Sequence, residues 1–327
     1  MVTKTIYLLS LSKGVKAMSK YRILSIDGGG IRGVIPATIL KRLLNDAAAD
    51  KIIDKTDLIA GTSTGGLLTL GIANGMTPED MQRIYINEGK NIFDDTWIDD
   101  LKDLGGLTGA DYDIVNLTKV LKKLFGDTKL KKLKKRVLVT AFDLDNEAAL
   151  PSTRSWKPKI FHNFPGADSD GDEYAYKVGL YTSAAPTYFP TVDGYIDGGV
   201  FASNPSMCAL SQSQDSRFFE HHPQIDEIVL LSLGTGTSLN FIKGRNLDWG
   251  FAQWIKPLIS IMMDGVNGIA DYQCRQILKD NYFRLAPVFP HNVSIPMDDV
   301  KKIPYMLRFA EKVNLNPLIN WLAVKWF

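Results

Sequence analysis

Two short apolar runs near the start of the chain each end in a glycine-rich turn that leads directly into a helix-spaced pattern. The first run covers residues 21–26, and apolar residues then recur at helical spacing between positions 34 and 47. The second covers residues 58–60, followed by an apolar helix pattern over residues 66–73 that closes at Asn74-Gly75. Consecutive strand–turn–helix units predict an α/β fold with a mostly parallel central sheet.

The rest of the chain extends this prediction. Thr77-Pro78 carries the capping and proline signals of a helix start, and we expect that helix to reach about Phe93. Further helices are expected over residues 111–125, 254–263, 264–277 and 317–327, and further strands over residues 136–142 and 228–233. Met262 and Met263 are expected in the core. We interpret residues 21–327 as one domain, with a lid-like insertion around 94–135, a helical C-terminal part from about 247, and residues 1–20 as a leader or tail.

Composition narrows the class of protein. A chain of 327 residues that is 45% hydrophobic and 23% charged can bury a large core. The formal net charge of +2 gives no indication of a nucleic-acid partner, and Cys208 and Cys274 alone indicate neither a disulfide framework nor a cysteine zinc site. No run approaches the ~20 apolar residues of a membrane span. These features favour a cytoplasmic protein without a metal, and any membrane contact is expected to be transient and peripheral.

Ser63 lies within Gly61-Thr62-Ser63-Thr64-Gly65, after a predicted strand and before a predicted helix. Gly61 and Gly65 remove the side-chain clashes that would prevent a sharp strand-to-helix turn. A serine in such a turn lies at a helix N-terminus, where the helix dipole stabilises an alkoxide. The position therefore predicts that Ser63 is a nucleophile.

Gly28, Gly29 and Gly30 supply consecutive backbone N–H groups at the start of the first helix. Such groups bind anions well. We therefore expect this loop to form an oxyanion hole, with Arg32 adding a positive charge beside it.

A dinucleotide site is the competing interpretation of this loop, because Gly28, Gly30 and Gly33 also match the pattern G-x-G-x-x-G. That site needs an acidic residue about 20 positions further on, at the end of a second strand. Asp46 and Asp50 do not end a clear strand, so the oxyanion hole is favoured.

Three motifs occur in a fixed order along the chain. They are Asp27-Gly28-Gly29-Gly30-Ile31-Arg32-Gly33, then Gly61-Thr62-Ser63-Thr64-Gly65-Gly66, then Asp197-Gly198-Gly199 with Asn204-Pro205 soon after it. In this order and spacing they resemble the signature of the patatin-like phospholipases. Residues 183–190 and 231–236 are also similar to segments of that family, so the resemblance covers about residues 21–236.

The resemblance implies a patatin-type three-layer sandwich with helices on both faces of the sheet, and a catalytic dyad of Ser63 and Asp197. Ser63 would attack an ester carbonyl, and Asp197 would take its proton and later activate water. Asp197 follows the apolar pair Tyr195-Ile196 and precedes two glycines, Gly198 and Gly199. The glycines leave room for its carboxylate to approach the serine turn. The implied substrate is a phospholipid or lysophospholipid, cleaved without calcium or another cofactor.

A histidine base remains the alternative to Asp197, because the order serine, acid, histidine also forms triads. His221 and His222 lie in a polar connection, and His291 follows a proline in a loop. All three are less well placed than Asp197.

Other functions also stay open at this point. They are an esterase or thioesterase acting on soluble acyl substrates, a lipid-binding protein with a latent dyad, and an effector, delivered to a host, that a small molecule or protein activates. The basic run 129–136 could contact anionic headgroups, although a solvated approach to the next strand is favoured. Residues 183–190 either position substrate or form a turn that packs two aromatic side chains.

Overall fold

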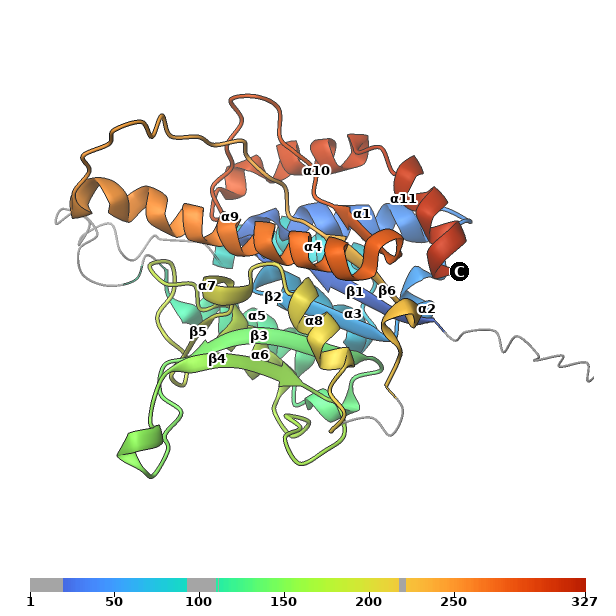
Figure 1. Cartoon of the computed structure of the whole chain (residues 1–327), viewed down its shortest axis with the longest axis horizontal. Helices are drawn as coiled ribbons and strands as arrows, with labels where there is room; N and C mark the ends of the chain where they lie inside the picture. The colour runs from blue at the N-terminus through green and yellow to red at the C-terminus, as the bar shows by residue number, and fades with distance from the viewer. Residues whose placement is uncertain (1–19, 93–109, 111, 218–221) are drawn as a thin grey trace, which may run out of the picture.

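A seven-stranded sheet forms the centre of the computed structural model, which describes residues 20–92, 110, 112–217 and 222–327 (Figure 1). Five strands run in the order β3-β2-β1-β6-β7 with every neighbouring pair parallel. β4 and β5 both pair with β3 in the antiparallel direction. The strands are β1 (Tyr21–Ile26), β2 (Leu58–Thr62), β3 (Arg136–Asp143), β4 (Lys157–His162), β5 (Tyr195–Asp197), β6 (Ile228–Leu233) and β7 (Tyr282–Leu285). The predicted mostly parallel α/β fold is confirmed.

Helices cover both faces of this sheet, which makes it the middle of three layers. They are α1 (Val34–Leu44), α2 (Ile52–Lys55), α3 (Thr64–Asn74), α4 (Pro78–Ile92), α5 (Ile114–Phe125), α6 (Ala175–Ser183), α7 (Gly199–Ala202), α8 (Ser206–Ser213), α9 (Phe251–Leu278), α10 (Ile303–Lys312) and α11 (Asn316–Trp321).

The alternation of side chains along β1 explains the two covered faces. Leu24 and Ile26 point into a buried cluster with α1, α4 and α10, whereas Ile23 points into another cluster with α8 and α9. A third cluster joins α3, α5 and α6 to β3. Both faces of the sheet are apolar because both are buried.

The predicted lid-like segment is only partly within the described residues, since 93–109 and 111 lie outside them, as do residues 1–19. Its described helix α5 is packed in the core, where Leu117, Leu121 and Phe125 are buried against α6. The helix begins at Asp113, whose carboxylate accepts the N–H of Val115.

The two helices predicted over residues 254–277 are one helix, α9, and that prediction was wrong. Nothing between Met263 and Asp264 ends the helix, and Pro257 falls near its start, in the second turn. Figure 1 shows α9 as the long orange helix across one face of the molecule. The prediction that both methionines are core residues was also wrong, because Met262 is 55% exposed and Met263 is half-buried.

The C-terminal residues close the core, as predicted. After α11, residues Leu322–Trp326 form one turn of π-helix, and the side chain of Trp326 is fully buried against the cluster around α1. No helix among the described residues is both long and apolar enough to cross a membrane.

Candidate active site

Ser63 occupies a sharp turn between β2 and α3. Its backbone has φ 54° and ψ −124°, a left-handed conformation that a serine adopts only under strain. Gly61 and Gly65 allow this turn, because a Cβ on Gly65 would collide with the carbonyl oxygen of Ile26 and one on Gly61 with that of Gly65. The strand-to-helix turn predicted for Ser63 is therefore confirmed.

Two threonines that the sequence did not single out hold this turn in place. The N–H of Ser63 donates to Thr182 Oγ1 at 2.7 Å, and Thr182 Oγ1 donates to the carbonyl oxygen of Thr140 at 2.6 Å. The turn is thereby tied to β3 through the end of α6. Because hydroxyl groups that bond to backbone have no pattern in sequence, this support could not be predicted.

Asp197 ends β5 beside Ser63 and is only 5% exposed. Its Oδ1 accepts the N–H of Gly199 at 2.7 Å. Burial raises the pKa of Asp197 to about 6, while the neighbouring Ser63 hydroxyl and the N–H of Gly199 act in the opposite direction. At neutral pH the carboxylate is thus ionised and able to accept a proton. Gly198 packs against the Thr140 backbone, where a side chain would not fit.

The glycine loop lies next to Ser63, since a Cβ on Gly28 would stand 3.4 Å from Ser63 Cβ. Gly28 was predicted as an oxyanion donor, but its N–H is already donated to the carbonyl oxygen of Ser203 at 2.9 Å. This corrects the prediction for Gly28. Among the described residues, the N–H groups of Gly29 and Gly30 have no acceptor.

Gly30 requires its glycine. Its φ is +58°, and a Cβ would collide with the carbonyl oxygen of Met297, which also accepts the N–H of Ile31 at 2.7 Å. Thr235 supports the other side of the loop, because its Oγ1 donates to the carbonyl oxygen of Gly28 at 2.7 Å. Residues far along the chain therefore shape this loop.

Arg32 was predicted beside the oxyanion hole, and its side chain does lie against the Gly29 carbonyl of that loop. It lines a separate polar cavity and not the pocket that contains Ser63. Its Nε donates weakly to the carbonyl oxygen of Gly29 at 3.3 Å.

Gly33 lies where a Cβ would collide with Thr64 and Tyr85, so its role is close packing of α1 against α3.

A buried ion pair anchors the start of the loop. Arg284 on β7 donates to both oxygens of Asp27, at 3.1 and 2.6 Å, and to Ser232 Oγ at 2.7 Å. Burial lowers the pKa of Arg284, but the charge and hydrogen bonds of Asp27 outweigh it and raise that pKa overall. Arg284 lies outside the three motifs, and only the pairing of β6 with β7 brings it here.

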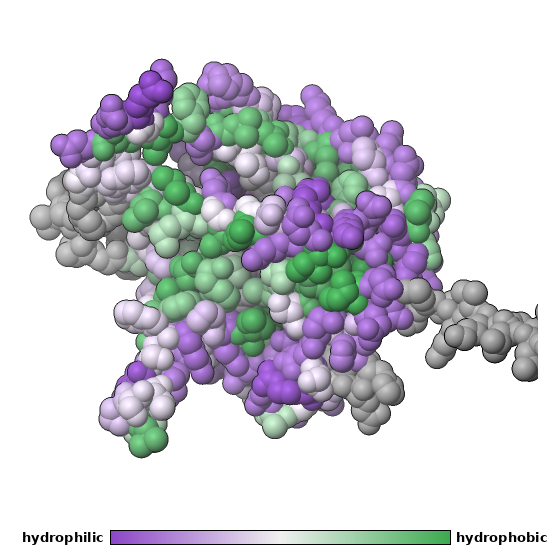
Figure 2. Space-filling model, in the orientation of Figure 1, coloured by the Kyte–Doolittle hydropathy of each residue, from purple (hydrophilic) through white to green (hydrophobic). Residues whose placement is uncertain are grey.

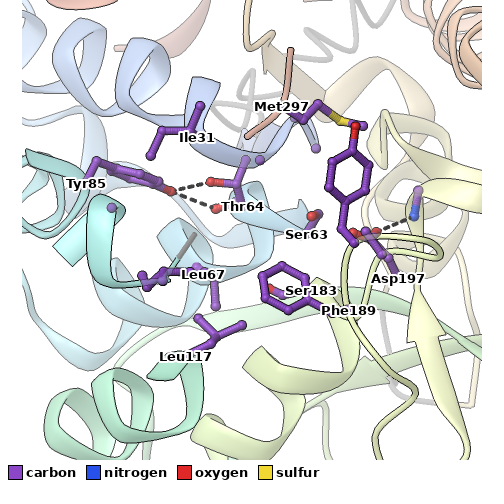
Figure 3. Close-up of a pocket in the computed structure, with 18 of the residues that line it drawn as sticks. Ile31, Ser63, Thr64, Leu67, Tyr85, Leu117, Ser183, Phe189, Asp197 and Met297 are labelled. Carbon is purple, nitrogen blue, oxygen red and sulfur yellow. Dashed lines mark hydrogen bonds between the residues drawn. The ribbon is translucent and has the colours of Figure 1, made fainter. Parts of the chain in front are cut away.

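An apolar pocket of about 350 Å³ opens at Ser63. Figure 3 shows Ser63 and Asp197 side by side, with Leu67 and Leu117 projecting into the same space. The apolar side chains come from the glycine loop, α3, α4, α5, residues 185–189 and α9, and they include Ile31, Met81, Ile84, Val120, Leu121, Phe189 and Met263. Residues 185–189 also line it, and Tyr188 and Phe189 pack on Tyr112, which confirms the turn that packs two aromatic side chains, while substrate positioning stays a prediction.

No histidine lines this pocket among the residues described, and His221 lies outside them. His222 and His291 lie in loops, as expected. Nor do any three histidine, cysteine or acidic side chains of the described residues gather closely enough to hold a metal ion.

A mostly parallel sheet, a serine on a strained strand-to-helix turn and an adjoining apolar pocket define an α/β protein of the serine-hydrolase type. Residues 24–210 match the family model of the patatin-like phospholipases, and the chain belongs to that family. This membership supports a lipid acyl hydrolase.

The chain is similar to several individual proteins. Protein teg of Priestia megaterium is 26% identical over 336 residues, which cover 94% of this chain and 100% of that protein. Patatin-like protein 2 of Oryza sativa subsp. indica is 32% identical over 284 residues, covering 71% of this chain and 65% of that protein. The crystal structure of VipD from Legionella pneumophila aligns with a TM-score of 0.38 at 12% identity, covering 89% of this chain and 67% of that one.

Proposed function

We propose that the protein is a serine lipid acyl hydrolase that cleaves fatty-acyl ester bonds of glycerophospholipids, as a phospholipase A or lysophospholipase. One observation carries the proposal most directly: Ser63, on its strained turn, lies beside the buried carboxylate of Asp197 at an apolar pocket. A nucleophile with a base beside it is the arrangement that ester hydrolysis requires.

In the proposed reaction, Asp197 takes the hydroxyl proton while Ser63 Oγ attacks the ester carbonyl. The N–H groups of Gly29 and Gly30 stabilise the oxyanion, and each such donor contributes about 2.7–4 kcal/mol in other hydrolases. The tetrahedral intermediate expels the alcohol, which takes the proton from Asp197. Asp197 then activates water, which releases the fatty acid from Ser63. Every step uses side chains and backbone of this chain, so calcium is not required.

The pocket supports a long acyl chain as the group transferred to Ser63. Its volume of about 350 Å³ lies within the range of small-ligand sites, and its walls are almost wholly apolar. A fatty chain in such a pocket gains free energy as its apolar surface leaves water. A short soluble acyl group would leave most of this surface uncovered.

An apolar stripe on α9 supports transient contact with a membrane surface. Six large side chains are exposed along one side of this helix, at positions that fall within one helical face, namely Trp254, Leu258, Ile261, Met262, Ile269 and Tyr272. Figure 2 shows hydrophobic patches along the path of α9 across the molecule. Because Met262 also lines the acyl pocket, the stripe adjoins the pocket. We call these six residues the α9 stripe.

The basic run 129–136 supports membrane contact less well. Lys129 and Lys131 both bind Asp172, and Lys135 donates to the carbonyl oxygens of Asp54 and Thr56. These partners favour a structural role for the run.

Active-site labelling and lipid hydrolysis test the proposal together. A fluorophosphonate probe should label the wild type and the control Ser152→Ala, whose serine is exposed and remote, but not Ser63→Ala. Fatty-acid release from phospholipid micelles should follow the same pattern. Labelling of Ser63→Ala, or its full activity on lipid, would contradict the role of Ser63.

Rates on two substrates separate the remaining alternatives. A lipid hydrolase should hydrolyse micellar phospholipid faster than a short soluble ester. An esterase for soluble substrates should hydrolyse the short ester faster. Absence of both activities in protein that the probe still labels would favour an enzyme that needs a small-molecule or protein activator.

A further inference from the structure

A second cavity adjoins the acyl pocket, and its character is the opposite. It has a volume of about 580 Å³ and is lined by serine, threonine, asparagine and charged side chains. Gly28, Tyr188, Met263 and Met297 line both spaces, so the two meet at the glycine loop beside Ser63. A molecule held at Ser63 can therefore extend into both.

The inner side of α9 forms one wall of this polar cavity. Ser260, Asp264, Asn267 and Asp271 follow one another at four-, three- and four-residue spacing, on the side of the helix opposite the α9 stripe. A surface helix normally turns its apolar side inward. α9 does bury Ala270, Cys274 and Leu278, but its polar row also faces the protein, and partly buried groups such as Asn267 and Asp271 need partners to offset the loss of hydration.

The charges in the cavity are of both signs and are separated. Asp27 and Arg284 satisfy each other, which leaves Arg32, Asp264 and Asp271 to face the space. Arg32 forms no ion pair within 4 Å in the part of the chain that the structure describes, although Asp264 is the largest charge acting on it. Asp271 Oδ2 binds Arg275 at 3.1 Å, but its Oδ1 is buried without a partner, and so is Asn267 Oδ1.

We propose that this cavity binds the headgroup of a zwitterionic phospholipid with a primary ammonium, its phosphate at Arg32 and its ammonium at Asp264, Asn267 and Asp271. The inference rests on the proposed lipid hydrolysis and adds the substrate class to it. The unpartnered oxygens are acceptors only, and an ammonium supplies N–H donors to them. A trimethylated amine has no N–H to donate, and an uncharged headgroup alcohol leaves the carboxylates uncompensated.

The joined cavities give the two ends of such a lipid separate environments. The acyl chain lies in the apolar pocket, the ester carbonyl lies at Ser63, and the glycerol passes Gly28 into the polar cavity. Specificity follows because an unmatched headgroup leaves buried carboxylate oxygens unpaired.

Hydrolysis of lipids with identical acyl chains tests the proposal. In mixed micelles, the wild type should cleave phosphatidylethanolamine at least about tenfold faster than phosphatidylglycerol or phosphatidylcholine, the effect of one charge-assisted hydrogen bond. Asp271→Asn should reduce this preference by about tenfold, and Asp264→Asn, at the more exposed rim, by less. Asp54→Asn changes an exposed carboxylate far along the chain and should keep the preference.

Arg275→Gln is the matched control for Asp271. It breaks the same ion pair but leaves the Asp271 carboxylate facing the cavity. A purely structural role of the pair predicts the same effect from both variants, whereas headgroup binding predicts that only Asp271→Asn changes the preference. Equal rates on the three lipids, or equal effects of the two variants, would overturn the proposal.

A binding measurement separates failure of this proposal from failure of the proposed function. In calorimetry, the Ser63→Ala protein should bind glycerophosphoethanolamine measurably. It should bind glycerophosphoglycerol at least about tenfold more weakly. If no lipid is hydrolysed yet this difference is found, the hydrolase proposal fails and the headgroup site stands. If lipid is cleaved through Ser63 while binding and rates ignore the headgroup, only the headgroup site fails.

Discussion

Replacing Asp197 by asparagine should stop ester hydrolysis and yet stabilise the protein at neutral pH. The carboxylate is buried, and its pKa is about 6 in the folded protein against an ordinary value of 3.8. The folded state therefore holds the Asp197 proton more tightly than the unfolded state does. As pH rises from about 4 to about 6, this group makes the free energy of unfolding of the wild type fall.

The size of the effect follows from that shift. About two pKa units at 1.36 kcal/mol each give roughly 3 kcal/mol, which is fully present below about pH 4 and is lost progressively as pH rises to about 6. Asparagine carries no charge to bury, but it accepts a weaker hydrogen bond from the N–H of Gly199, which costs about 1 kcal/mol. Asp197→Asn should thus be about 2 kcal/mol more stable than the wild type above pH 7.

Denaturant unfolding of both proteins at several pH values between 4 and 8 measures this difference. The gap in free energy should widen with pH and level off above about 6. In parallel, kcat/KM of the wild type should increase with pH through about 6 as Asp197 ionises. A gap that does not change with pH would refute the assignment of the raised pKa, and an active Asp197→Asn would refute its role as the base.

Four further variants test other parts of the structure. Arg284→Met should lower the free energy of unfolding by about 3–5 kcal/mol because Asp27 is left buried and unpaired, and adding Asp27→Asn should restore part of it in denaturant titrations. Trp326→Ala should cost about 3–5 kcal/mol by the same measurement, whereas a loss below 1 kcal/mol would contradict its place in the core. Gly30→Ala should reduce kcat much more than KM, since Met297 and the positive φ both oppose a side chain where the oxyanion is held. Leu258→Ser combined with Ile269→Ser should weaken sedimentation with lipid vesicles about tenfold and affect soluble-ester hydrolysis less, and unchanged vesicle binding would argue against the α9 stripe as a membrane contact.

The strand–turn–helix units and the serine turn could be predicted because their causes are local. The apolar run of β2, Gly61, Gly65 and the apolar residues of α3 lie within seventeen consecutive positions, 58–74, and each favours the same geometry. The apolar segment 317–327 was likewise predicted to close the core, and Trp326 is buried there.

The details of the site depend on contacts that sequence spacing does not reveal. The N–H of Gly28 is occupied by Ser203, and Arg32 turns away from Ser63 into the polar cavity. Thr182 supports Ser63 and Arg284 supports Asp27, and each lies more than a hundred positions along the chain from its partner. α9 was predicted as two helices, and its apolar residues lie on two sides, exposed in the α9 stripe and buried at Ala270, Cys274 and Leu278, so that no single apolar face marks residues 251–278 as one helix.

The way the glycine loop is held has a consequence for the smallest unit that can fold. The family match ends at residue 210, but β6 and β7, which supply Arg284, and the loop that supplies Met297 all come later. A fragment limited to the matched segment would expose β1, an almost wholly buried strand, as an unpaired sheet edge, an arrangement that promotes aggregation. The C-terminal third is thus part of the folding unit, and exchange of whole N-terminal segments between relatives should fail unless β6 and β7 are exchanged with them.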